Sequence, residues 1–142
     1  MRVIGLDIGE RRIGVALSDR LGLTAQPHSV IDRDPRDRGG AVGTVAALVR
    51  STGAERVVAG LPLDLSGEVG RQARLTLIFV EALEERLEVP VETWDERFST
   101  AAAERALLEG NVRRAKRRQV RDKVAAALIL QTWLDARGMA PP

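Results

Sequence analysis

Acidic side chains stand beside apolar segments at three places that are far apart in the sequence. The acids are Asp7, the neighbouring pair Asp95 and Glu96, and Asp122. An ionised carboxylate is costly to bury without a positive partner, and two carboxylates about 4 Å apart repel by roughly 4 kcal/mol at an effective dielectric constant of 20. A divalent cation relieves this repulsion, so we expect these acids to form a metal site.

The chemistry of such a site follows from its ligands. Carboxylate oxygens favour hard cations, so Mg²⁺ or Mn²⁺ is expected rather than zinc. Two such ions can activate water and stabilise the leaving oxygen of a phosphodiester, and this reaction needs no histidine base. The single histidine, His28, lies in a proline-containing segment and is expected to be structural or solvent-facing. The absence of cysteine excludes disulfides, zinc–thiolate sites and cysteine nucleophiles.

The position of Asp7 is unusual for a charged residue. Asp7 lies in the apolar segment 2–8, where strand alternation places it on the same face as Val3 and Gly5. The side chains beside it are therefore small. The alternative interpretation is an aspartate that caps a turn at the end of a strand.

Asp95 and Glu96 directly follow the apolar segment 89–94. Acids at the carboxyl end of a parallel strand lie where α/β sheets bind their ligands. If the strand continued through both residues, their side chains would point to opposite sides. Only one of them is then expected to reach the site first, and which of the two binds metal stays open. The alternative is an ordinary exposed turn.

Asp122 stands at the start of an apolar helix. At 100° per residue it shares a face with Ala126 and Trp133, and this face should pack inwards. A lone acid on that face favours a functional role. The alternative is a salt bridge with Arg118 or Lys123.

Basic residues gather around the start of the same helix. Seven of the eleven residues from 113 to 123 are basic and one is acidic, although the formal net charge of the chain is only +2. This clustering favours binding of a polyanion, and the alternative is a solvated helix face. With 3% aromatic residues and no tyrosine, arginine contacts to phosphate would dominate over base stacking. We expect nucleic-acid contacts from Arg11, Arg12, Arg97, Thr100, Arg113, Arg114, Lys116, Arg117, Arg118, Arg121 and Lys123.

Strands alternate with helices along the chain, which predicts an α/β fold with a mixed sheet and helices on both faces. A hairpin turn is expected at 9–12, and Pro27 favours an edge position for the third strand. Ser66 or Gly67 is expected to cap the second helix. The predicted strands cover 2–8, 13–18, 24–31, 56–61 and 89–94, and the predicted helices cover about 41–51, 68–87, 99–110 and 115–136.

The length and composition fit a single domain. The chain has 142 residues, of which 44% are apolar and 30% charged. A chain of this size can bury a hydrophobic core without disulfides or structural metal ions. We expect one domain over 1–138, followed by a short tail at 139–142. No apolar run has transmembrane length. The amino terminus lacks the charged, apolar and small-residue sections that make up a signal peptide. A cytoplasmic location without a membrane partner is therefore expected.

Four segments resemble the YqgF/RuvX family, which belongs to the RNase H-like superfamily related to Holliday junction resolvases. The segments lie in the family's order and span nearly the whole chain. One difference is that the family's DER block commonly ends in two threonines, whereas Ser99 replaces the first of them here. The matching segments are GLDIGERRIGVALSD at 5–19, AGLPLDLSGEVG at 59–70, DERFST at 95–100 and DKVAAALILQTWL at 122–134.

The resemblance implies a fold and a function. The implied fold is RNase H-like, with a mixed five-stranded sheet in the order 3-2-1-4-5 and helices on both faces. It implies that Asp7, the acid of the DER block and Asp122 form the metal site. It further implies a nuclease that processes the 5′ end of precursor 16S ribosomal RNA.

Two alternatives to RNA processing remain. The first is a Holliday junction resolvase acting on branched DNA, which would normally cut as a symmetric dimer; the sequence reveals no dimer interface, so a monomer and a homodimer are both possible. The second is a non-catalytic nucleic-acid-binding protein whose acids are structural. A two-domain sugar-kinase or actin-type ATPase would require a longer chain than these 142 residues.

We predict that the double variant Arg117→Glu, Arg118→Glu binds every nucleic-acid sequence more weakly by a similar factor, because phosphate contacts carry no sequence information. The slope of log affinity against log salt should become shallower by about one for each phosphate that the variant no longer binds. Fluorescence anisotropy titrations at several salt concentrations measure both effects. An unchanged slope would remove these arginines from the interface.

Overall fold

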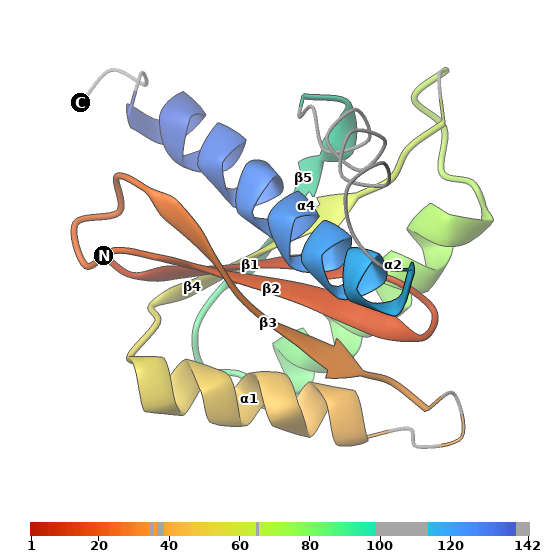
Figure 1. Ribbon diagram of the computed structural model, residues 1–142, viewed down its shortest axis with the longest axis horizontal. Coiled ribbons are helices and arrows are strands. Elements are labelled where there is room, and N and C mark those ends of the chain that lie inside the picture. The colour runs from red at the N-terminus through yellow and green to blue at the C-terminus, as the bar shows by residue number, and fades with distance from the viewer. Residues whose placement is uncertain (35, 37–38, 65, 99–113, 139–142) are drawn as a thin grey trace.

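The computed structural model describes residues 1–34, 36, 39–64, 66–98 and 114–138, and for residue 98 and residues 114–121 it describes the backbone alone. The helix predicted at 99–110, with Thr100, Arg113 and the tail 139–142, lies outside the described residues. The described part forms a sheet with helices on both of its faces (Figure 1).

Five strands form one mixed sheet. They are β1 (Val3–Ile8), β2 (Arg12–Ser18), β3 (Ala25–Asp32), β4 (Arg56–Leu61) and β5 (Val91–Asp95). Their order is β3-β2-β1-β4-β5, which confirms the predicted order. Strands β1, β2 and β3 pair antiparallel, whereas β4 runs parallel to β1 and β5 parallel to β4. Pro27 lies in β3 at the edge of the sheet, where its missing N–H group is tolerated.

The helices occupy opposite faces of this sheet. Helices α1 (Gly40–Thr52) and α2 (Arg71–Arg86) pack on one face, and α4 (Arg114–Gly138) crosses the other (Figure 1). A short 3-10 helix, η1 (Glu96–Phe98), follows β5. Strand alternation divides the core accordingly: Ile4 and Leu6 join the cluster with α1 and α2, whereas Val3 joins the cluster with α4. The expected helices on both faces are therefore confirmed.

The start of α2 differs from the prediction. The helix begins at Arg71 with Gly70 as its N-cap, several residues after the expected Ser66 or Gly67. The reason lies in Asp64, whose Oδ1 accepts hydrogen bonds from the backbone N–H groups of Ser66 and Glu68 and from the Ser66 hydroxyl. These bonds hold the segment in a turn and delay the helix.

Helix α4 lies directly on the backbone of the sheet because three facing strand residues are glycines. A Cβ atom added to Gly5 would come within 2.7 Å of the Leu130 Cβ, and one added to Gly60 within 2.6 Å of the Ile129 Cδ1. The closest approach is at Gly14, where an added Cβ would lie 2.0 Å from the backbone oxygen of Asp122. The glycines therefore set the height of α4 above the sheet.

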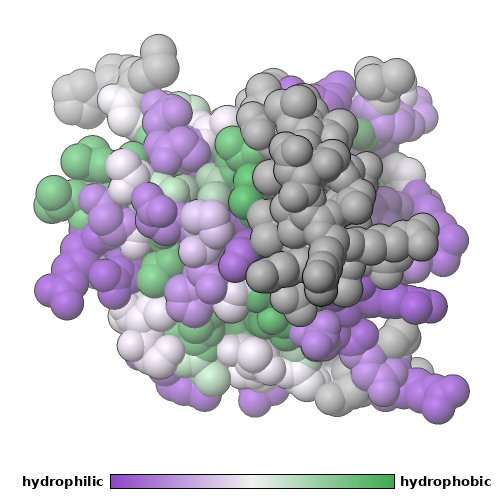
Figure 2. Space-filling view, viewed as in Figure 1, coloured by the Kyte–Doolittle hydropathy of each residue, from purple (hydrophilic) through white to green (hydrophobic). Residues whose placement is uncertain are grey.

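Hydrophilic side chains cover much of the described surface on the face shown in Figure 2. Apolar side chains are exposed at the turn between β2 and β3, where Leu21 is 77% and Leu23 is 64% exposed. Within the described ranges, no helix combines the length and the apolar character that crossing a membrane requires.

We predict that Gly14→Ala lowers the free energy of unfolding by about 3 kcal/mol, because overpacking against a rigid backbone group is destabilising. The added methyl group must displace either α4 or β2. Chemical denaturation measures the effect. Gly39→Ala is the matched control, since no atom of the described residues lies within 4 Å of a Cβ there, and it should cost less than about 1 kcal/mol. Equal losses in both variants would contradict the close approach of α4.

Candidate active site

A cavity of about 330 Å³ opens at the carboxyl ends of the parallel strands β1, β4 and β5. This is the end of an α/β sheet at which ligands are usually bound. Three acids from three different elements line it: Asp7 from β1, Glu96 from η1 and Asp122 from α4. Among the described residues, those that line it are Asp7, Ile8, Gly9, Pro62, Gln72, Glu96 and Asp122.

Asp7 and Asp122 are brought together by Gly14. In the β1–β2 ladder Asp7 lies directly opposite Gly14. The backbone carbonyl of Asp122 rests on Gly14, so closely that no side chain could fit between them. Any residue larger than glycine at this position would therefore separate Asp122 from Asp7. Sequence reasoning expected small residues beside Asp7 but did not identify this one.

Glu96 lies over a second glycine. A Cβ atom added to Gly60 in β4 would come within 2.8 Å of the Glu96 Oε1 and 3.0 Å of its Cγ. The Glu96 side chain therefore fits into the space above β4 that the glycine leaves open. In the sequence, Gly60 looks like part of a strand-to-loop connection, so its role in seating Glu96 was missed.

Asp95 does not line the cavity but pairs with Arg97. The Arg97 Nε donates to both carboxylate oxygens of Asp95, at 3.1 and 3.0 Å, and the second terminal nitrogen of Arg97 donates at 2.6 Å. The Arg97 side-chain hydrogen bonds lower the pKa of Asp95, outweighing the effect of its partial burial. Of the two neighbouring acids, the structure thus places Glu96 in the cavity and uses Asp95 to hold an arginine.

Asp122 forms an ion pair that the sequence did not predict. Its Oδ2 accepts a hydrogen bond of 2.9 Å from the Nε of Arg12. The side chain of Arg118, one of the two partners considered from the sequence, lies outside the described residues. The two partners are 110 residues apart in the sequence. Both side chains are largely buried, with exposed fractions of 28% for Arg12 and 17% for Asp122. Such a pair is costly to break on one side only, because the remaining charge is left buried.

The donor set fits a hard divalent cation in its chemistry. The three acids offer carboxylate oxygens, the ligands that Mg²⁺ and Mn²⁺ favour. In the part of the chain that the structure describes, no three acids or histidines are close enough to form a finished metal site as they stand. Binding of one cation by Asp7, Glu96 and Asp122 together would therefore require these side chains to move, and for Asp122 this movement would start from its bond to Arg12.

The other predicted contact residues fall into two groups. Arg11 is exposed in the turn between β1 and β2, and Lys123 is half-buried on α4. For the remaining basic residues of α4, from Arg114 to Arg121, only the helical backbone is described. At the rim, Arg71 of α2 pairs with Glu10 at 3.1 Å, a contact that sequence reasoning missed. His28 is exposed on β3 beside the Ser29 hydroxyl, as expected.

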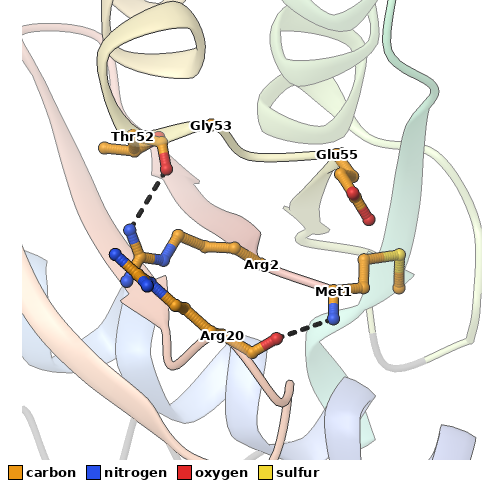
Figure 3. Close-up of a pocket in the computed structure, with 6 residues that line it drawn as sticks. All are labelled: Met1, Arg2, Arg20, Thr52, Gly53 and Glu55. Carbon is orange, nitrogen blue, oxygen red and sulfur yellow. Dashed lines mark hydrogen bonds between the residues drawn. The ribbon is translucent and has the colours of Figure 1, made fainter.

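A second cavity, of about 350 Å³, lies at the opposite end of β1 (Figure 3). Arg2 donates from its guanidinium group to the Thr52 carbonyl at 3.1 Å, which ties the end of α1 to the start of β1. The Met1 amino group donates to the Arg20 carbonyl at 2.7 Å. Among the described residues that line this cavity, Glu55 is the single acid. These contacts hold the layers together and offer no carboxylate cluster.

Solved structures with this fold include two Holliday junction resolvases. The Thermus thermophilus RuvC structure in complex with a Holliday junction substrate matches with a TM-score of 0.59 at 20% identity, covering 100% of this chain and 99% of that one. The fowlpox virus Holliday junction resolvase matches with a TM-score of 0.57 at 13% identity, covering 96% and 99%. At these identities the likeness concerns the fold, and it confirms the RNase H-like architecture.

Sequence relatives cover nearly the whole chain. A protein of Symbiobacterium thermophilum is 51% identical over 142 residues, which is 100% of this chain and 97% of the relative. A protein of Desulforamulus reducens is 46% identical over 136 residues, covering 96% and 98%. Both relatives carry the name "Putative pre-16S rRNA nuclease". The sequence model of the family described as "RuvX: Holliday junction resolvase" matches residues 1–136, and the chain therefore belongs to the RuvX family.

Proposed function

We propose that this protein is a divalent-metal-dependent nuclease that hydrolyses phosphodiester bonds in structured RNA, with precursor 16S ribosomal RNA as its substrate. The observation that carries the proposal is the meeting of Asp7, Glu96 and Asp122 in one cavity at the carboxyl end of the parallel strands. Relatives at 46–51% identity named for precursor 16S rRNA favour RNA as the substrate.

In the proposed reaction Asp7, Glu96 and Asp122 would hold Mg²⁺ or Mn²⁺. The bound ion would supply Lewis-acid chemistry, which activates water and offsets charge on the leaving oxygen. Arg11, two residues after Gly9 of the lining, and Arg97, next to Glu96, are both exposed, and their guanidinium groups suit the phosphates flanking the cleaved bond. Asp95 holds Arg97 in place through its hydrogen bonds and is a positioning residue.

Cleavage of branched DNA is the second candidate. The family description names a Holliday junction resolvase, and the fold matches such enzymes. A resolvase cuts two strands related by two-fold symmetry and so acts as a dimer. The same chemistry at the three acids would serve either substrate. The two candidates are therefore distinguished by comparing the rates at which RNA and branched DNA are cleaved.

We expect purified protein to cleave a precursor 16S rRNA fragment in Mn²⁺ or Mg²⁺ and to leave it intact in chelator. A four-way DNA junction and an unstructured single strand should be cleaved more slowly. Asp7→Asn should abolish cleavage while retaining RNA binding measured in chelator, because it removes a metal ligand without removing a phosphate contact. Gel assays of end-labelled substrates and binding titrations provide the measurements.

These assays also separate the alternatives. Preferential cutting of the four-way junction would favour the resolvase. Tight binding without metal-dependent cleavage of any substrate would support the non-catalytic binding protein. Metal-dependent cleavage retained by Asp7→Asn at the wild-type rate, from a preparation free of contaminating nuclease, would contradict the assignment of Asp7.

We further predict different effects for the two neighbouring acids. Glu96→Gln should lower kcat by more than about 100-fold. Loss of a residue that only supports a metal ligand typically costs about 10- to 100-fold, so a larger loss is expected for a ligand itself. Asp95→Asn should act mainly by raising KM, because it loosens Arg97, and should cost about 10-fold or less in kcat. The two variants carry the same chemical change, carboxylate to amide, at adjacent positions. A larger kcat loss in Asp95→Asn than in Glu96→Gln would reverse the assignment.

A further inference from the structure

Arg12 has an unusual position for a residue expected to contact nucleic acid. It begins β2, next to the exposed Arg11, yet its Nε donates to a carboxylate that lines the cavity. With 28% of its side chain exposed, Arg12 is reachable from solvent and also engaged with Asp122. One arginine thus contacts an acid of the cavity and still keeps part of its side chain in solvent.

The ion pair gives the Asp122 carboxylate a positive partner, which a metal ion could also provide. The Asp122 side chain is 17% exposed, so its charge needs a partner at all times. Arg12 is that partner in this structure. A divalent cation held jointly with Asp7 and Glu96 would satisfy the same carboxylate with twice the charge. Both partners together would place a cation beside a guanidinium group, which repel each other.

The backbone around Asp122 is too tightly packed to move toward β2. Its carbonyl already rests on Gly14, where an added Cβ would lie only 2.0 Å away. An exchange of partners must therefore occur through rotation of the Asp122 and Arg12 side chains. Both side chains have staggered alternatives and retain partial access to solvent, so this rotation needs no change in the fold.

We propose that Arg12 is a built-in counter-ion of Asp122, that divalent metal displaces it, and that the displaced guanidinium group then binds a substrate phosphate. This inference rests on the proposed nuclease function and adds a link between metal and RNA binding. Because coupling between two ligands is reciprocal, metal should tighten RNA binding and RNA should tighten metal binding. A guanidinium group is well suited to either partner, since it binds carboxylate and phosphate oxygens alike.

The first test measures Mn²⁺ affinity of the full chain by electron paramagnetic resonance of free Mn²⁺, without any cleavage step. Arg12→Gln keeps a hydrogen-bond donor for Asp122 but removes the competing charge. Its Mn²⁺ affinity should rise by about tenfold, because the charge that opposes the ion at short range is gone. Arg12→Lys keeps the charge and should stay close to wild type.

Arg11→Gln is the matched control, because it removes the same charge from the adjacent, exposed position. Screening by solvent should limit its effect to less than about twofold. Weaker or unchanged Mn²⁺ binding in Arg12→Gln would overturn the proposal, since it would mean that Arg12 holds Asp122 ready for the metal. A thermal melt in chelator confirms that each variant is folded, and Mn²⁺ should raise the Tm of Arg12→Gln by more than that of wild type.

The second test addresses the phosphate contact. Binding of a fluorescent RNA hairpin is titrated with and without Ca²⁺, which occupies oxygen sites. Ca²⁺ should strengthen RNA binding by a larger factor in wild type than in Arg12→Gln. Equal factors would overturn the transfer of Arg12 to phosphate. Failure to cleave any RNA would contradict the nuclease proposal and leave the Mn²⁺ result intact, so the two failures are distinguishable.

Discussion

The close contact between α4 and the backbone of the sheet is the constraint on which the rest of this structure depends. Glycines at positions 5, 14 and 60 leave room for the helix, and the helix fills that room with small residues and Ile129 and Leu130. Interiors pack at nearly crystalline density, so a single methyl group at such a contact is felt. Because α4 carries Asp122, the height of the helix above the sheet also decides whether its carboxylate can meet the acids of the strands.

The two faces of the sheet have different roles. One face provides most of the hydrophobic core, and the other brings the polar groups of the cavity together. The face covered by α1 and α2 is packed with large side chains, among them Leu6, Phe79 and Leu83, which are all buried. The face covered by α4 carries Val3, Ala16 and Val58. Apolar area on the first face provides much of the burial that favours folding. The second face can then be shaped by glycine and alanine to bring polar groups together at its end.

Three carboxylates near this end of the sheet form ion pairs with arginines. Asp95 is held by Arg97, Asp122 by Arg12 and Glu10 by Arg71. The partly buried pair at Asp122 matters most for folding, since exposed pairs contribute little. The Asp122 carboxylate is therefore compatible with the folded state without a cation. A guanidinium group binds carboxylate and phosphate oxygens alike, so the groups that pair with these acids are also chemically suited to bind phosphate.

The sequence by itself determined the elements and much of their arrangement. Some features follow from local patterns that can be recognised within a few residues. These are the alternation in 2–8, the proline at position 27 that favours an edge strand, and the apolar stripe of 124–134. Tertiary structure alone decided that Glu96 rather than Asp95 faces the cavity, because this depends on the turn that η1 makes after β5. It also decided that Asp122 pairs with Arg12, 110 residues away, and that Gly60 makes room for Glu96. Such contacts depend on how separate layers stack, and no pattern within one segment records that.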